Sequence, residues 1–358
     1  MFIPKKHRCL LICKEVYLKV PIIKYSALEY WLDGTDRYYY LAPDAHTIEK
    51  DFNFKIDDDF ACKLAKEYNL ILPLNLMVPD NYKRNHTDQC QFYKWIKNIP
   101  RNSFYRLLDR GNEDENIYVC SPELTFCIAA KMFSPAETIL IGNMLCATYV
   151  FDNNDGMKQR ARQQITTSKK IKNYIDKAEC FKGIKNARNA AKYIVDNCNS
   201  LREAQIATIA SIPIKNGGYG MPEFEMNGEV HVRKEYSGGL GRKILKCDIV
   251  WQMEKVVVEY ESNMTHLDKN QHRYDKRRST ALAGTGYKAI YITNDDINSL
   301  SKIDDTFFMI KKALHQRYSN AKFEQFIDLR YDVYNVVFRK NYFNAFCANK
   351  YLSEKNFS

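Results

Sequence analysis

The chain of 358 residues is long enough for two domains, and its composition, 45% hydrophobic and 27% charged, is that of a globular protein. A total of 54 Lys and Arg against 43 Asp and Glu gives a net charge of +11, which favours an anionic partner. No apolar run approaches the ~20 residues that cross a bilayer, and the N-terminus lacks the pattern of a signal peptide. We therefore expect a cytoplasmic protein with no membrane partner.

The 11 cysteines are scattered along the chain, without a Cys-x-x-Cys pair and without a clustered Cys/His spacing. A disulfide framework or a structural zinc site would need such clustering. The spacing favours reduced and mostly buried thiols.

Residues 1–155 are expected to form a mixed α+β domain. Stretches 69–78, 89–96 and 103–108 read as strands. Two helix starts follow, Ser121-Pro122 and Ser134-Pro135, each a serine cap before a proline at the first helical position. We expect the first helix to reach Phe133 and the second to reach Tyr149.

Residues 156–198 are expected to be a basic helical connector. Between 158 and 192 the chain holds eleven Lys or Arg residues against Asp176 and Glu179 only. Isoleucines and alanines alternate with these cations, so the segment predicts amphipathic helices with one positive side, broken at Lys182-Gly183. A run of charge is also typical of a merely solvated face. The residues expected to contact DNA here are Lys169, Lys170, Lys185 and Arg188.

Residues 199–305 are expected to fold as a mixed sheet flanked by helices, followed by a helical extension over 306–358. A helix over 201–212 begins with a capping box, in which the Glu203 side chain can return to the Ser200 amide. An edge strand over 222–232, strands 244–251 and 255–261, a basic helix over 269–283 and a strand over 287–293 follow.

The hairpin of strands 244–251 and 255–261 carries acids where buried strands normally have none. Asp248 lies in the first strand, and Glu259 and Glu261 lie on one face of the second. If paired positions sum to an odd number, for example 248 opposite 259, the carboxylates lie within ~5 Å of one another across the strands. An even register would place Asp248 on the opposite face.

Carboxylates held that close repel one another, and a divalent cation relieves the repulsion. An all-oxygen set favours Mg²⁺ or Mn²⁺, with Asp248, Glu259 and Glu203 as ligands. Such an ion supports hydrolysis of a phosphodiester. Cations from the next helix are placed to hold the phosphate, and His266 and Gln271 are possible further contributors. The cations are Arg273, Lys276, Arg277 and Arg278.

These motifs resemble the PD-(D/E)XK nuclease superfamily, and within it the DUF559 branch related to very-short-patch mismatch-repair endonucleases. The matching segments are Ser200–Glu203, Lys246–Val250, Val257–Glu261 and Arg277–Tyr287. The resemblance implies a mixed sheet flanked by helices and Mg²⁺-dependent cleavage of DNA. It also implies catalytic roles for Glu203, Asp248, Glu259 and Glu261. The superfamily's motif lysine is absent, because Glu261 stands at its position.

The N-terminal half resembles AbiEi-like proteins, which are antitoxins or regulators of bacterial phage-defence systems. The segments that carry this resemblance are Pro21–Leu28, Val78–Asp80, Ile96–Phe104 and Val119–Glu123. It implies a role linked to nucleic acid and no particular activity.

Two functional hypotheses remain open. The first is a metal-dependent DNA endonuclease acting in phage defence or DNA repair. The second is a non-catalytic DNA-binding regulator or antitoxin, in which Glu259 and Glu261 face solvent or pair with the arginines. Cutting both strands of a duplex with one such site would need a homodimer or a second event.

Overall fold

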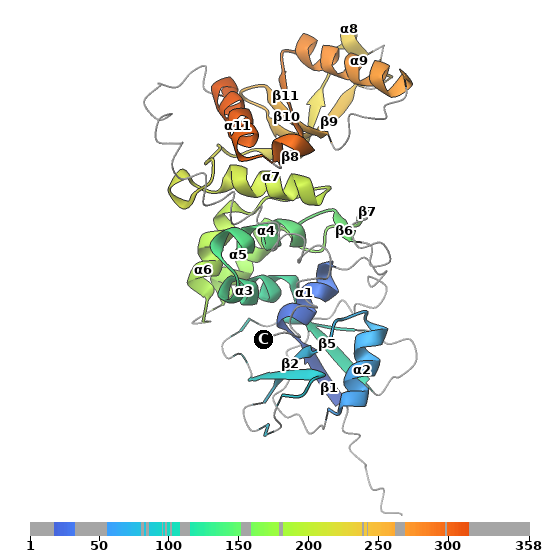
Figure 1. The fold of residues 1–358 in the computed structure, drawn as a ribbon, viewed down its shortest axis with the longest axis vertical. Coiled ribbons are helices and arrows are strands. Elements are labelled where there is room, and N and C mark those ends of the chain that lie inside the picture. The colour runs from blue at the N-terminus through green and yellow to red at the C-terminus, as the bar shows by residue number, and fades with distance from the viewer. Residues whose placement is uncertain are drawn as a thin grey trace, which may run out of the picture.

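The computed structural model describes residues 18–32, 56–79, 82–83, 86–94, 96, 99–100, 102–107, 115–151, 159–178, 182–237, 240–241, 243–261, 269–297 and 299–314. Within these ranges the chain is a mixed α/β protein with eleven helices and three sheets, of the predicted fold class. The elements stack along one long axis (Figure 1). The N-terminal sheet lies at one end, helices fill the middle and the C-terminal sheet lies at the other end.

Five strands form the N-terminal sheet: β1 (Leu18–Ile22), β2 (Leu74–Val78), β3 (Cys90–Lys94), β4 (Phe104–Arg106) and β5 (Glu115–Cys120). Their order is β3-β2-β1-β5-β4, with β1 parallel to β5 and antiparallel to β2. The strands predicted over 89–96 and 103–108 are confirmed as β3 and β4. The strand predicted from residue 69 begins only at Leu74, because Asn69 has a φ of 47° and closes the turn after α2 (Asp58–Glu67).

Helix α1 (Lys24–Leu32) connects this sheet to a layer of four helices: α3 (Pro122–Met132), α4 (Pro135–Leu145), α5 (Ser168–Lys177) and α6 (Ile184–Ala190). The predicted caps are present, since the hydroxyl of Ser121 accepts the Leu124 N–H at 3.2 Å and that of Ser134 accepts the Glu137 N–H at 3.3 Å. Each cap satisfies a backbone donor that the first helical turn leaves open.

One prediction for this layer was wrong in its boundary. Helix α4 ends at Leu145 and not at Tyr149, because Tyr149 begins the strand β6 (Tyr149–Phe151), which pairs with β7 (Gln159–Ala161). The basic segment is helical, as predicted, and its helices α5 and α6 bury Ile171 and Ala187 in the same apolar cluster as α3 and α4.

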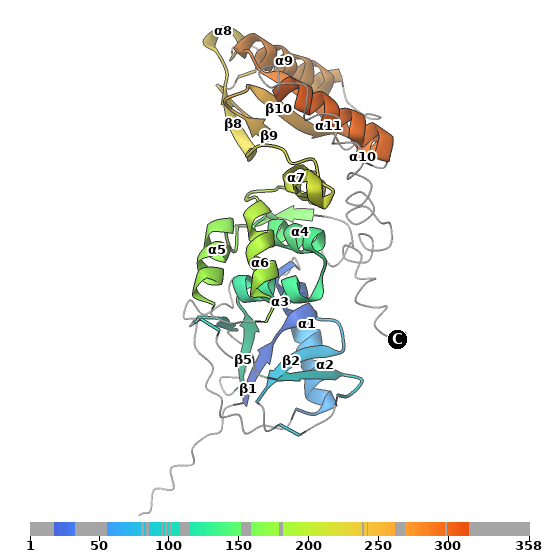
Figure 2. The same cartoon turned by 90° about the vertical axis from the view of Figure 1, so that its left-hand side faces the viewer.

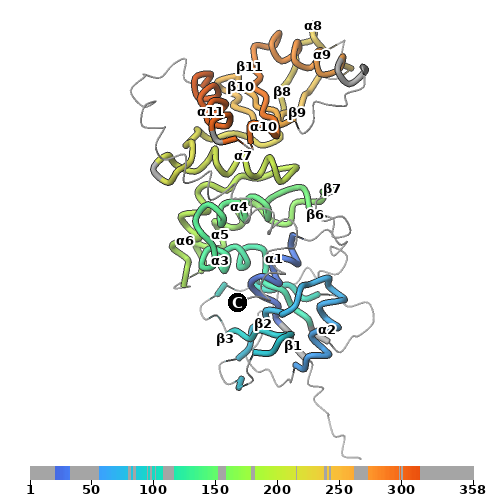
Figure 3. The backbone as a smooth tube through the Cα atoms, in the orientation of Figure 1, coloured from blue at the N-terminus to red at the C-terminus, as the bar shows by residue number. Residues whose placement is uncertain are grey.

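Helix α7 (Leu201–Ser211) lies between this layer and the C-terminal sheet in both views (Figures 2 and 3). The buried Asn143 of α4 donates to the Thr208 hydroxyl at 2.9 Å, which ties α7 to the helical layer. On the other side the ring of Tyr219, just after α7, stacks on Phe307 at a centroid distance of 3.9 Å.

The C-terminal sheet has four strands: β8 (Glu225–His231), β9 (Ile244–Trp251), β10 (Val256–Glu261) and β11 (Lys288–Thr293). Their order is β11-β10-β9-β8, so β8 is an edge strand, as predicted. Four helices accompany them: α8 (Lys234–Ser237), α9 (Lys269–Thr285), α10 (Asn294–Ile297) and α11 (Leu300–Leu314).

This sheet has a separate core on each face. Val257 packs with Leu282 of α9, whereas Val256 and Val258 belong to the cluster that contains Phe307 of α11. The expected domain boundary between residues 305 and 306 falls inside α11, a helix that packs on the sheet through Phe307. The rest of the predicted extension, residues 315–358, lies outside the described residues.

The described cysteines are free thiols, and all but Cys62 are buried, in agreement with the expectation of reduced cysteines. Within the described ranges, no helix combines the length and the apolar character that crossing a membrane requires.

Candidate active site

The hairpin of β9 and β10 has the odd register that the acid cluster requires. Val256, Val257 and Val258 pair with Trp251, Val250 and Ile249, so that each pair of positions sums to 507. The predicted odd register is therefore confirmed. The paired positions end at Val258 and Ile249, so Asp248 and Glu259 come directly after the last pair.

Asp248 interrupts the strand in which it lies. Its Oδ2 accepts the Tyr260 N–H at 2.6 Å, so a side chain takes the place of a backbone acceptor. Residues two apart in a regular strand share a face, yet Cys247 packs in the core beneath α9 and Ile249 in the core beneath α11. The strand therefore rotates at Asp248, and the carboxylate lies between β9 and β10.

The neighbouring strand β8 is irregular at the facing position, Asn227. This residue has a φ of 51°, in the left-handed region where asparagine is more common than most residues. Its Nδ2 donates to the Asn197 carbonyl at 2.8 Å and to Oε2 of Glu203 at 2.7 Å. The distortion in β8 thus brings the first turn of α7 to the edge of the sheet.

Glu203 is buried and accepts three hydrogen bonds. Besides the one from Asn227, it accepts the Asn199 N–H at 2.9 Å and the Ser200 hydroxyl at 3.0 Å. A capping contact exists as the sequence predicts, but it reaches the Asn199 amide and not the Ser200 amide. The side chain is therefore held firmly by neutral donors.

Glu259 is paired with Arg278 of α9. Nη2 of Arg278 donates to Oε1 of Glu259 and to the Lys246 carbonyl, and it lies 3.6 Å from Sγ of Cys247. Both side chains of the ion pair are mostly buried, at 22% and 12% exposure. Pairing of a glutamate with an arginine was one of the open alternatives, and it is realised for Glu259.

The electrostatics indicate that the acids influence one another. Burial, followed by the charges of Glu203 and Glu259, raises the pKa of Asp248 to about 7, although the Tyr260 N–H and Arg278 oppose the shift. Burial also raises the pKa of Glu203, against its three hydrogen bonds, and the charge of Glu259 adds to the rise. Perturbed acids of this kind are concentrated at functional sites.

Glu261 is half-buried at the end of β10. Burial, then Asp275 of α9 and then Glu259, raises the pKa of Glu261. Position 261, where the motif lysine would be, therefore has an acidic neighbour in Asp275. The cation nearest the cluster comes instead from α9, as Arg278.

The fit of a metal ion rests on the chemistry of the donors. Among the described residues, no group of three His, Cys, Asp or Glu side chains is arranged to enclose an ion. Mg²⁺ commonly binds through one or two carboxylates together with water and substrate phosphates. Asp248, Glu259 and Glu203 are oxygen donors of this kind, but the three do not close around one ion in this structure. A hard divalent cation there would take one or two of these carboxylates and complete its ligand set with water and substrate phosphate.

The other predicted DNA-binding residues are exposed. Arg273, Lys276 and Arg277 are exposed on α9, unlike Arg278. The cations expected on α5 and α6 are exposed as well: Lys169, Lys170, Lys185 and Arg188. His266 and the side chain of Gln271 lie outside the described residues.

Four residues around the site were not predicted: Asn199, Arg202, Asn227 and Tyr260. Tyr260 donates its hydroxyl to Oδ1 of Asn294 at 2.7 Å, and Arg202 donates to Gln205 at 3.0 Å beside it. For Asn227 the sequence does contain a signal, because the dipeptide Asn227-Gly228 is a turn former inside a stretch that otherwise reads as a strand.

No family model, no curated protein and no solved structure matches this chain.

Proposed function

We propose that the acid cluster between α7, β9 and β10 is the active site of a metal-dependent endonuclease that hydrolyses phosphodiester bonds of DNA. The observation that carries this proposal is the closeness of three acids: the charges of Glu203 and Glu259 add to the burial that raises the pKa of Asp248, beside the ion pair of Glu259 with Arg278. A carboxylate in such surroundings has a stability cost, which binding a cation would relieve.

Each residue has a distinct part in this proposal. Asp248, with a pKa of about 7, would hold a cation as its carboxylate. Glu203, oriented by Asn199, Ser200 and Asn227, or Glu259 would supply a second carboxylate oxygen. A Mg²⁺ or Mn²⁺ ion bound there would polarise the phosphate and activate a water.

Arg278 supplies the positive charge that position 261 lacks. It fixes the orientation of Glu259 through the ion pair. A guanidinium at the edge of the cluster also stabilises negative charge on a phosphate held beside the acids. The exposed cations of α5, α6 and α9 would bind the DNA backbone, with a strong dependence on salt.

The direct test is cleavage of supercoiled plasmid in Mg²⁺ or Mn²⁺. We expect nicking by the wild type and a loss of at least about 100-fold in Asp248→Ala. Glu254→Ala is the matched control, because Glu254 is an exposed acid in the turn of the same hairpin. Conversion to linear DNA that increases steeply with protein concentration would indicate action as a homodimer.

The second candidate is a DNA-binding regulator or antitoxin without catalysis. It is favoured by the Glu259–Arg278 pair, which neutralises one acid without a metal. Under this hypothesis, wild type and Asp248→Ala bind DNA equally and neither nicks it. That result would reject the nuclease.

A further inference from the structure

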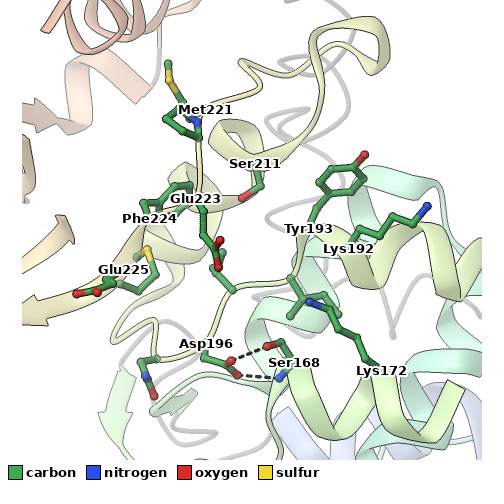
Figure 4. A pocket seen from close by; sticks show the side chains of 15 residues that line it. Ser168, Lys172, Lys192, Tyr193, Asp196, Ser211, Met221, Glu223, Phe224 and Glu225 are labelled. Carbon is green, nitrogen blue, oxygen red and sulfur yellow. Dashed lines mark hydrogen bonds between the residues drawn. The ribbon is translucent and has the colours of Figure 1, made fainter. Parts of the chain in front are cut away.

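A cavity of about 560 Å³ lies beside α7, between α5 and the segment that leads into β8 (Figure 4). Its volume is typical of a site for a small molecule. One wall comes from α5 and from the 3-10 turn η3 (Ala191–Tyr193), and the opposite wall comes from Pro222–Met226. None of the predicted catalytic acids lines it.

The first wall combines positive charge with an aromatic ring. The exposed Lys172 extends from α5 toward the cavity, and the half-buried Tyr193 lies above it (Figure 4). Lys192 also lines the wall, with its ammonium 3.4 Å from Oδ1 of Asn189. A lysine beside an aromatic ring is a common arrangement for a phosphate attached to a flat group.

The opposite wall combines an aromatic ring with an acid. Phe224 is half-buried there, and the exposed Glu223 extends into the space between the walls (Figure 4). The cavity has two further acids, and both are engaged. Asp196 accepts from the Ser168 amide at 2.8 Å and its hydroxyl at 2.6 Å, and Glu225 accepts from Gln252 at 3.1 Å.

Glu223 and Lys172 are therefore the charged groups with which a ligand would interact. No hydrogen bond or ion pair ties either of them to another described residue. Because acids outnumber lysines in the lining, a bare anion such as phosphate is a poor match. The wall chemistry suits a ligand with a phosphate for Lys172, a flat ring for Tyr193 and a hydrogen-bond donor for Glu223, whereas the ring of Phe224 packs against Trp251 at a centroid distance of 5.4 Å.

We propose that this cavity binds a nucleotide whose base carries an exocyclic amino group, such as cytosine. The phosphate contacts Lys172, the base lies against Tyr193, and the amino group donates to Glu223. A carboxylate accepts readily from the amino group of cytosine, whereas thymine and uracil present a carbonyl at that place. The shared chemistry covers both a free nucleotide and one unit of a nucleic acid strand.

The position of the cavity connects two surfaces described above. Lys169 and Lys170 lie on α5 next to Lys172 and are exposed. At its other side the cavity is lined by Asn197, whose carbonyl accepts from Asn227, the residue that also holds Glu203. A strand that crosses α5 and enters the cavity would approach the acid cluster. Binding itself does not depend on whether the cluster cleaves DNA.

The test is calorimetric titration of the full chain in EDTA, so that cleavage cannot interfere. The probes are CMP, UMP and the 5′-phosphorylated dinucleotides of deoxycytidine and of thymidine. We expect the cytosine probes to bind at least about 5-fold more tightly than their uracil or thymine counterparts. Equal affinity for CMP and the dinucleotide would identify a free nucleotide as the ligand, and tighter binding of the dinucleotide would identify a strand.

Matched variants locate the binding. Lys172→Ala should weaken binding by about 10-fold, the effect of one charge-assisted hydrogen bond. Lys177→Ala, at the other end of the same helix and outside the cavity, should leave it unchanged. Glu223→Gln should reduce the preference for cytosine, because an amide can also donate to the carbonyl of thymine or uracil.

Three results would overturn the proposal. The first is no binding of any probe at millimolar concentration. The second is equal weakening by Lys172→Ala and Lys177→Ala, which would assign the binding to the general positive charge of α5. The third is a base preference that Glu223→Gln leaves unchanged.

Discussion

Both sheets of this protein bury polar side chains, and the two sets differ in charge. In the N-terminal sheet the fully buried Asn75 is a neutral amide, which accepts the Tyr25 N–H at 3.3 Å and donates to the Pro73 carbonyl at 3.2 Å. In the C-terminal sheet the corresponding groups are carboxylates, and the pKa of Asp248 is raised to about 7. Asn75 has neutral partners, whereas the acids lie close enough for the charges of Glu203 and Glu259 to help raise the pKa of Asp248.

This difference distinguishes a buried polar group that serves the fold from acids that would serve a function. A buried amide with its hydrogen bonds made costs little and fixes one arrangement of strands. Like-charged acids cost stability in the metal-free chain, and selection retains such groups where a ligand uses them. The predictions below test this contrast by altering one group at a time.

The largest effect is expected from Arg278→Met, which leaves Glu259 without its cation. Removing one partner of a mostly buried pair should lower the free energy of unfolding by about 2–3 kcal/mol, measured by urea denaturation at pH 7. The double variant Arg278→Met/Glu259→Gln should recover most of this loss, since no lone charge remains. Additive losses in the double variant would mean that Arg278 acts only through its contact with the Lys246 carbonyl.

Asn75→Ala should lower the free energy of unfolding by about 2 kcal/mol, because the Tyr25 amide loses its acceptor and a small cavity forms. Asn173→Ala is the control, since Asn173 is exposed on α5. Denaturation at pH 6 and at pH 8 should give the same loss, because no charge is involved. A loss that varies with pH would mean that a charged group contributes at Asn75 as well, and the contrast between the two sheets would not hold.

The sequence predicted most of the regular elements around the acid cluster. The polar gap between two β-branched runs indicated the β9–β10 hairpin, and alternation placed Glu259 and Glu261 on one face. The odd register followed from requiring the acids to meet, and the structure confirms it. Local pattern carries this information because a strand repeats every two residues.

The distortions at the site could not be predicted in the same way. The rotation of β9 at Asp248 depends on the Tyr260 amide, twelve positions later in the chain. The side chain of Arg278 points toward the acids, whereas that of Arg277 is exposed. This difference depends on how α9 packs over Val257. Both are tertiary effects, and helical periodicity alone does not distinguish one arginine of a pair from the next.

Asp248→Asn is expected to stabilise the metal-free protein at pH 8 by about 1–2 kcal/mol while abolishing cleavage. The folded-state pKa of Asp248, about 7, lies above the ordinary value of 3.8, so its contribution to stability is present at low pH and is lost as pH rises through 7. Asparagine removes that cost and still accepts the Tyr260 N–H. The gain should therefore vanish at pH 4 in thermal denaturation with EDTA. Asp176→Asn, exposed on α5, should change nothing at either pH.

The smallest effect concerns Lys24, a half-buried charge in the N-terminal part. It has a φ of 53°, and its ammonium lies 3.3 Å from the centroid of the Tyr93 ring. Burial, and then the charge of Lys131, lowers the pKa of Lys24 from 10.5 to about 8. As the pH rises, the folded chain therefore releases this proton before the unfolded chain does. The charged amine thus lowers the stability of the fold at pH 7, and this cost is relieved as pH rises from about 8 to 10.

Lys24→Met should gain less than about 1 kcal/mol at pH 7, because solvent screens a half-exposed amine and the contact with Tyr93 is lost. The gain should disappear by pH 10, where the wild-type amine is neutral. Lys177→Met, on the exposed face of α5, should give no such pH dependence. A gain that persists at pH 10 would arise from backbone conformation or packing and not from the charge of Lys24. Lys24 would then be no exception to the contrast in charge between the two sheets.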